Sequence, residues 1–177
     1  MNIRFARSEA EKLIEKFEFT KENLPINVKL IAKHLNLKVV EKQLDEDVSG
    51  LLISDKRIGG ASYVFVNEND SPVRRRFTIS HEIGHYVLRH KFDTENVHID
   101  RVFHAIPRLS SAVSGVDERE VEANQFAASL LMPANFVTEL VNDLNSALSE
   151  NHISDLAKKF KVSEQAMTIR LTTLKLL

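Results

Sequence analysis

The chain has 177 residues, of which 43% are hydrophobic and 28% charged, as expected for a globular protein with a core of its own. Its 24 basic and 25 acidic side chains leave a formal net charge of −1, which argues against binding nucleic acid through bulk charge. Without cysteine it can form neither disulfides nor thiolate metal sites, so His, Asp or Glu must hold any metal. There is no signal-peptide or membrane-spanning run, and we expect a cytoplasmic protein.

The N-terminal part is predicted to contain short helices and strands. Residues 6–19 carry apolar side chains at helical spacing and should form an amphipathic helix. Asn27 is placed to cap a second, short helix, and the sequence LKVVE after that helix should be extended. Two strands are expected at residues 51–54 and 61–67, on either side of a turn.

A third helix, apolar on most of its surface, should begin at Ser71 and Pro72. Residues 90–116 have no clear period and predict a surface loop. The next helix is expected to begin near Asp117, where Glu120 stands in the position of a capping box, and to stop at Pro133. A further helix should follow at residues 134–146.

The C-terminal tail predicts two helices joined by the dipeptide KV, with Ser163 capping the second, and it resembles a helix-turn-helix. We therefore divide the chain into one domain at 1–150 and a helical element at 151–177. DNA binding is the less favoured role of this tail, because Glu164 opposes the few lysines that could contact phosphates. The side chains that its second helix would present are Ser163, Glu164, Gln165, Thr168 and Arg170.

The apolar helix RRRFTISHEIGHYVLRH, residues 74–90, contains the pattern His-Glu-x-x-His. His81 and His85 are four residues apart, so they lie on one helix face and can share one metal ion. Glu82 is turned by about 100° and would flank the metal as a general base. Gly84, costly inside a helix, should let another element approach closely. This pattern predicts a catalytic zinc site with two of its three protein ligands.

The third ligand should come from the helix that begins near Asp117. Glu118 and Glu120 fall in its first turn, where the helix dipole stabilises acids without a metal. A carboxylate at Glu122 is farther inside an apolar helix and needs a partner, so we predict Glu122 as the third ligand. The competing candidates are His90, His98 and His104.

RRRFTISHEIGHYVL followed by EREVEANQFAASLLMP resembles the ImmA/IrrE family of metallopeptidases, and the resemblance extends over most of residues 25–177. It implies an α+β, mainly helical zincin-like fold with a small antiparallel sheet. It also implies Zn²⁺ held by His81, His85 and the glutamate before AN, here Glu122, with Glu82 as the base. The substrate it implies is a regulatory protein, typically a helix-turn-helix repressor of a mobile element or stress response. Many members have a histidine eight residues after the first ligand; here Arg89 stands there and His90 follows.

In the predicted reaction Glu82 accepts a proton from water at the zinc and passes it to the leaving amine. The strand at 61–67 could pair with an extended substrate. Oxyanion stabilisation could come from Tyr63, Tyr86, His98 or His104. Two other interpretations stay open: a DNA- or protein-binding regulator with a structural or sensory zinc, and an inactive peptidase used as a binding module. The intact His-Glu-x-x-His disfavours both, because a structural zinc needs no base beside it.

Overall fold

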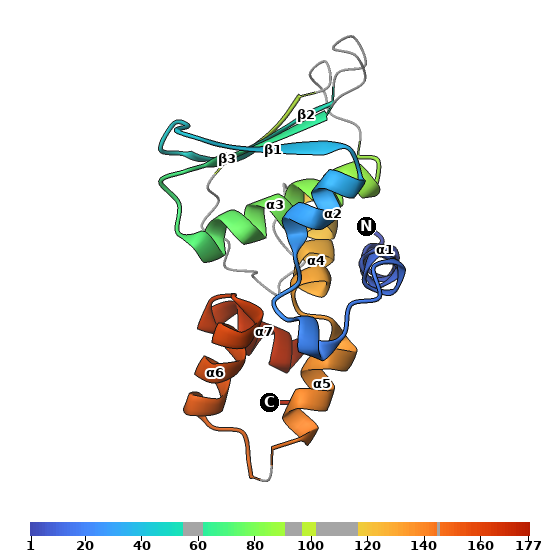
Figure 1. Ribbon diagram of the computed structural model, residues 1–177, viewed down its shortest axis with the longest axis vertical. Coiled ribbons are helices and arrows are strands. Elements are labelled where there is room, and N and C mark those ends of the chain that lie inside the picture. The colour runs from blue at the N-terminus through green and yellow to red at the C-terminus, as the bar shows by residue number, and fades with distance from the viewer. Residues whose placement is uncertain (55–61, 91–96, 102–116, 145) are drawn as a thin grey trace.

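The computed structural model describes residues 1–54, 62–90, 97–101, 117–144 and 146–177, and of 97–101 it describes the backbone (Figure 1). The fold is α+β and mainly helical, as predicted. In chain order its elements are α1 Ile3–Lys16, the 3-10 turn η1 Lys21–Asn23, α2 Val28–His34, β1 Leu37–Lys42, β2 Val48–Ser54, β3 Ser62–Asn67, α3 Pro72–Val87, β4 Val97–Arg101, α4 Glu118–Leu131, α5 Ala134–Asn142, α6 Glu150–Phe160 and α7 Glu164–Thr173.

Side-chain caps fix where several of these helices begin. The side chain of Asn27 accepts from the backbone N–H of Leu30 at the start of α2, and that of Ser163 accepts from Ala166 at the start of α7. Ser71 caps α3 with proline in its first turn, which is the arrangement that the sequence predicted. Asp117 caps α4 by accepting from the N–H of Arg119.

The described strands form one sheet in the order β1-β3-β2-β4. β2 pairs antiparallel with both β3 and β4, but β1 pairs with β3 in parallel, so the sheet is mixed and not antiparallel as expected. The parallel pairing arises because α2 and β1 come before the β2–β3 hairpin and β1 adds to its far side. β3 is therefore flanked on both sides and is a core strand, so it does not offer an edge that could pair with a substrate. β4, which the sequence had not predicted, is an edge strand of the described sheet.

α3 lies directly under the sheet (Figure 1). Leu52, Val64 and Val66 point from β2 and β3 towards it and are buried, as are Ile79 and Ile83 on the helix. Beneath α3 runs α4, which packs against α3 on one side and α1 on the other. The segment of α3 from residue 78 to residue 85 is buried on its whole circumference because sheet and helices enclose it.

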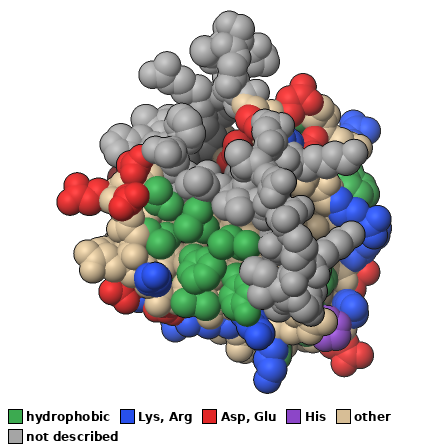
Figure 2. Space-filling view, turned by 90° about the horizontal axis from the view of Figure 1, so that it is seen from above, with side chains coloured by type: hydrophobic (Ala, Val, Ile, Leu, Met, Phe, Trp, Pro, Cys, Tyr) green, Lys and Arg blue, Asp and Glu red, His purple; other side chains and the backbone are tan. Residues whose placement is uncertain are grey.

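The outer face of the sheet is also apolar. Strand alternation places Val40, Leu51, Ile53, Tyr63 and Phe65 on this face, and all are half-buried. Figure 2 shows hydrophobic side chains gathered on the face seen from above. The rings of Tyr63 and Phe65 stack at 5–7 Å spacing typical of aromatic pairs, with centroids 6.1 Å apart.

The C-terminal helices share the hydrophobic core of the rest of the chain. Phe160, Met167 and Leu171 are fully buried in the same cluster as residues of α1, α3 and α4. The Arg76 guanidinium on α3 donates to the backbone carbonyls of Phe160, Lys161 and Ile26. The division at residue 150 stays a prediction about independent folding. No helix in the described ranges has the length and apolar character needed to cross a membrane.

Candidate metal centre

The two histidines of α3 point toward α4, which crosses α3 at Gly84. A Cβ on Gly84 would lie 3.3 Å from Cα and from the carbonyl oxygen of Ala123, and 3.1 Å from the Phe126 ring. A side chain at this position would push against Ala123 and Phe126, so glycine favours the close approach that the sequence predicted. The crossing brings the first turns of α4 next to His81 and His85, so carboxylates from α4 can reach them.

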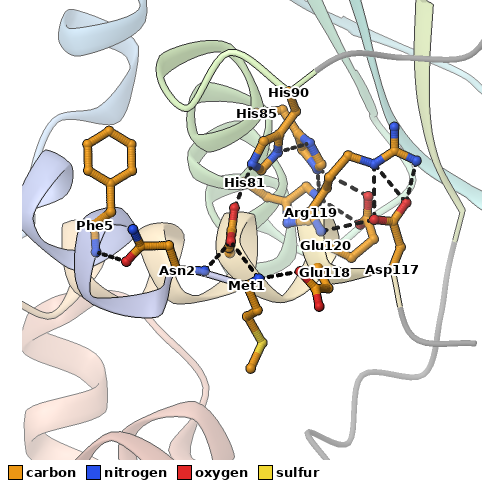
Figure 3. A network of polar contacts seen from close by, with 11 residues as sticks. Met1, Asn2, Phe5, His81, His85, His90, Asp117, Glu118, Arg119 and Glu120 are labelled. Atoms are coloured by element: carbon orange, nitrogen blue, oxygen red, sulfur yellow. Dashed lines mark hydrogen bonds and ion pairs between the residues drawn. The ribbon is translucent and has the colours of Figure 1, made fainter. Parts of the chain in front are cut away.

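Three side chains meet at this crossing with metal-ligand atoms close together: His81, His85 and Glu120. The Nε2 atoms of the two histidines lie 2.9 Å apart. Oε2 of Glu120 lies 3.2 Å from Nε2 of His81, and Oε1 lies 3.3 Å from Nε2 of His85. Figure 3 shows the three side chains converging from α3 and α4.

This donor set fits a zinc ion. Bonds of about 2.0 Å to a tetrahedral zinc place neighbouring donor atoms about 3.3 Å apart. The two Nε2 atoms lie 2.9 Å apart, and each lies 3.2 or 3.3 Å from one of the two carboxylate oxygens of Glu120. Two imidazoles and a carboxylate are also a known catalytic zinc set, which leaves the fourth position open. His85 is fully buried and His81 almost so, whereas the Glu120 side chain is 30% exposed, so the cluster is open on the Glu120 side.

Of the predicted site residues, the structure brings His81 and His85 together but places Glu122 elsewhere. Oε2 of Glu122 lies 3.1 Å from Nε2 of His90, and Oε1 accepts from the backbone N–H of Asn2. Glu122 as third ligand therefore stays a prediction that the geometry does not favour. His90 is not in the cluster of three. The side chain of His98 and all of His104 lie outside the described residues, as does most of the segment 90–116.

Glu82 is fully buried on the side of α3 that faces β2. Its Oε1 atom lies 3.2 Å from the position that a Cβ on Gly50 would occupy, and Thr78 Cγ2 would lie only 2.4 Å away. Gly50 is thus the point at which the sheet approaches the helix most closely beside the predicted base. A glycine at this point of β2 leaves room for the Glu82 carboxylate. Tyr63, a candidate for oxyanion stabilisation, lies on the opposite face of the sheet.

Comparisons with known proteins identify the family of the chain. The model of the peptidase M78 family, described as the IrrE N-terminal-like domain, matches residues 32–172. The chain belongs to the M78 peptidase family. It is also 29% identical over 136 residues to the uncharacterized immunity region protein 2 of Bacillus phage phi105, an alignment that covers 77% of this chain and 73% of that protein. The predicted resemblance is confirmed. The His-Glu-x-x-His pattern of α3 and Glu120 of α4 both lie within the matched residues.

Two residues of this M78 domain that the sequence analysis had not assigned contact the histidine pair. One is Glu120, which had been explained by a capping box and the helix dipole. The other is Asn124, whose Oδ1 lies 3.0 Å from Nδ1 of His81. The signal was present in the sequence, because Glu120 and Asn124 are four apart on α4, as His81 and His85 are on α3. An amide oxygen at Nδ1 favours the tautomer in which Nε2 is free to bind a metal.

His90 and Glu122 have shifted pKa values. Burial lowers the pKa of His90, and this outweighs the attraction of Glu122. Burial raises the pKa of Glu122, but the N–H of Asn2 and the His90 ring outweigh it and hold the pKa below its ordinary value.

Proposed function

We propose that this M78 family member is a zinc-dependent endopeptidase whose metal is held by His81, His85 and Glu120. The observation that carries the proposal is the convergence of these three side chains, with ligand atoms within 4.8 Å of one another, at a His-Glu-x-x-His helix in a peptidase family. The earlier candidate Glu122 is the alternative third ligand. A zinc ion held there would supply Lewis acidity, which polarises a substrate carbonyl and makes nearby water more acidic.

Glu82 is the proposed general base. It follows the first ligand directly, so it lies on an adjoining part of the helix surface and flanks the histidine pair without joining it. Burial against β2 holds the carboxylate in place and limits its access to water. In the proposed reaction Glu82 accepts a proton from the attacking water, and then donates it to the amine that leaves as the peptide bond breaks.

The substrate we propose is an extended segment of a regulatory protein, namely a helix-turn-helix repressor of a mobile element or stress response. The support is the family resemblance and the phage relative, whose name places it in an immunity region. β4 is an edge strand of the described sheet, and an extended peptide can add to such an edge through backbone hydrogen bonds. A selective substrate fits a peptidase that works in the cytoplasm, which is the location that we propose.

The regulator alternative has less support from the C-terminal helices. Arg170, which had been a candidate to face DNA, is 5% exposed and donates from Nε to the carbonyl of Met132. Burial lowers its pKa to about 10. The side chain therefore ties α7 to the end of α4 and is not available to read bases or phosphates.

The test uses helix-turn-helix proteins encoded beside this gene as substrates. Each is incubated with zinc-loaded wild-type protein or with Glu82→Gln, and the products are identified by mass spectrometry. We expect one defined cut by the wild type, none by Glu82→Gln, and no general digestion of casein. Glu82→Gln should retain zinc, because only the base is changed. Cutting by Glu82→Gln at the wild-type rate would show that Glu82 is not the base.

A further inference from the structure

A line of side chains continues outward from the metal cluster through His85. Nδ1 of His85 lies 2.9 Å from Nδ1 of His90, and Nε2 of His90 lies 3.1 Å from Glu122. The His90 and Glu122 side chains are 7% and 17% exposed, so water competes little for these contacts. The three residues come from α3, the turn after it, and α4.

The contacts fit an arrangement of protons that leaves one nitrogen of His85 free for a metal. Nε2 of His90 faces a carboxylate and must carry a hydrogen to make an attractive contact. In that tautomer the lone pair of His90 is on Nδ1, where it can accept a hydrogen from Nδ1 of His85. His85 with its hydrogen on Nδ1 has its lone pair on Nε2, the atom that faces His81 and Glu120.

The backbone places His90 over His85. Arg89 has a φ of 56°, in the left-handed region, and reverses the chain where α3 ends. The N–H of His90 then donates to the carbonyl of His85 at 3.1 Å, and that of Arg89 donates to Tyr86 at 3.3 Å. This pair of bonds is the Schellman motif that ends many helices. His90 is therefore bound to His85 through both its backbone and its ring.

Glu122 is held from its other side as well. The backbone N–H of Asn2 donates to Oε1 of Glu122, and the Asn2 side chain caps α1 by accepting from Phe5. Figure 3 shows Asn2 and its contact with Phe5 near the histidines. The carboxylate is thus anchored by α1 as it meets His90, and it does not have to turn toward the metal cluster to find partners.

We propose that His90 and Glu122 are positioning residues for the metal site: they hold His85 in the tautomer and ring orientation in which Nε2 binds the ion. Asn124 does the same for His81 from α4. This proposal takes one premise from the proposed function, namely that His81, His85 and Glu120 hold a metal. Loss of an outer partner of a metal-binding histidine weakens metal binding by about 10–100-fold.

The experiment measures zinc affinity by competition with a chromogenic chelator. We expect His90→Ala and Glu122→Ala each to weaken zinc binding about 10–100-fold. His90→Asn should restore most of the loss, because the amide oxygen can replace Nδ1 as acceptor. The double variant His90→Ala/Glu122→Ala should be no weaker than the worse single variant, because both changes break one connected line. Cobalt-loaded His90→Ala should show altered d–d absorption bands.

Matched controls are His34→Ala and Glu118→Ala, an exposed histidine on α2 and an exposed glutamate one turn before Glu122. Neither should change zinc affinity, and melting of the metal-free variants separates loss of fold from loss of metal. Unchanged affinity in His90→Ala, or His90→Asn as weak as His90→Ala, would overturn the proposal. So would a loss in Glu122→Ala far exceeding that in His90→Ala, which would make Glu122 a direct ligand. If wild-type protein binds no zinc, the proposed function fails too. If His81→Ala, His85→Ala and Glu120→Ala lose zinc while His90→Ala and Glu122→Ala keep it, this inference alone fails.

Discussion

Nε2 of His81 on α3 lies 3.2 Å from Oε2 of Glu120 on α4. The two residues are far apart in sequence and meet because their helices cross at Gly84 and Ala123. The proposed metal centre therefore depends on how closely two helices pack, and not only on the His-Glu-x-x-His pattern of one of them. Substitutions at the crossing should weaken metal binding by moving Glu120 away from the two histidines.

Gly84→Val tests this dependence. Its side chain would begin 3.3 Å from backbone atoms of Ala123, which cannot move away as a flexible side chain could. We expect a loss of about 1–3 kcal/mol in the free energy of unfolding and weaker zinc binding, because α4 must shift away from the histidines. The measurements are urea unfolding and chelator competition. Undiminished zinc affinity in a folded Gly84→Val protein would show that the crossing does not set the site.

Gly50→Ala tests the contact between the sheet and the base. The added Cβ would lie 2.4 Å from Thr78 Cγ2 and 3.2 Å from Glu82 Oε1. We expect destabilisation of about 1–3 kcal/mol from overpacking. Thr78→Ser removes Cγ2, so the double variant Gly50→Ala/Thr78→Ser should be more stable than Gly50→Ala alone. The measurement is urea unfolding of the wild type, the two single variants and the double variant. If the changes in unfolding free energy of the two single variants simply add up in the double variant, the close contact between Gly50 and Thr78 is contradicted.

Arg76→Met tests how the C-terminal helices are attached. The guanidinium donates to three backbone carbonyls, those of Ile26, Phe160 and Lys161, and methionine keeps the apolar stem but no donor. We expect a loss of about 1.5–3 kcal/mol in the free energy of unfolding, the usual range for hydrogen bonds to a charged group. The matched control is the neighbouring Arg75→Met, which breaks an exposed pair with Glu41 and should cost less than about 1 kcal/mol. Equal losses of unfolding free energy in the two variants would show that the Arg76 hydrogen bonds do not attach the C-terminal helices.

The sequence predicted those elements whose signals are local. The caps at Asn27, Ser71 and Ser163 are side chains that bond to N–H groups three residues on, so short motifs locate them. The buried helix around His81 follows from its apolar pattern. β4 and the parallel pairing of β1 depend on partners distant in the chain, and no local pattern contains them.

The site was predicted in part for the same reason. His81 and His85 are linked by helical spacing, which sequence shows directly. Which glutamate of α4 faces them depends on the rotation of α4 against α3, and that rotation is set by the contact at Gly84. Depth in an apolar helix pointed to Glu122, but its partners proved to be His90 and the N–H of Asn2. The Glu122 carboxylate therefore has two polar partners that are not metal ions.

The central claim is that Glu120 completes the metal site with His81 and His85. Its most direct test is the zinc dissociation constant of Glu120→Ala beside those of Glu122→Ala and Glu118→Ala, measured by titration with a competing chelator. We expect Glu120→Ala to lose zinc affinity by orders of magnitude, Glu122→Ala to lose about 10–100-fold as an outer partner, and Glu118→Ala to match the wild type. The greatest loss in Glu122→Ala, with wild-type affinity in Glu120→Ala, would contradict the account and make Glu122 the third ligand.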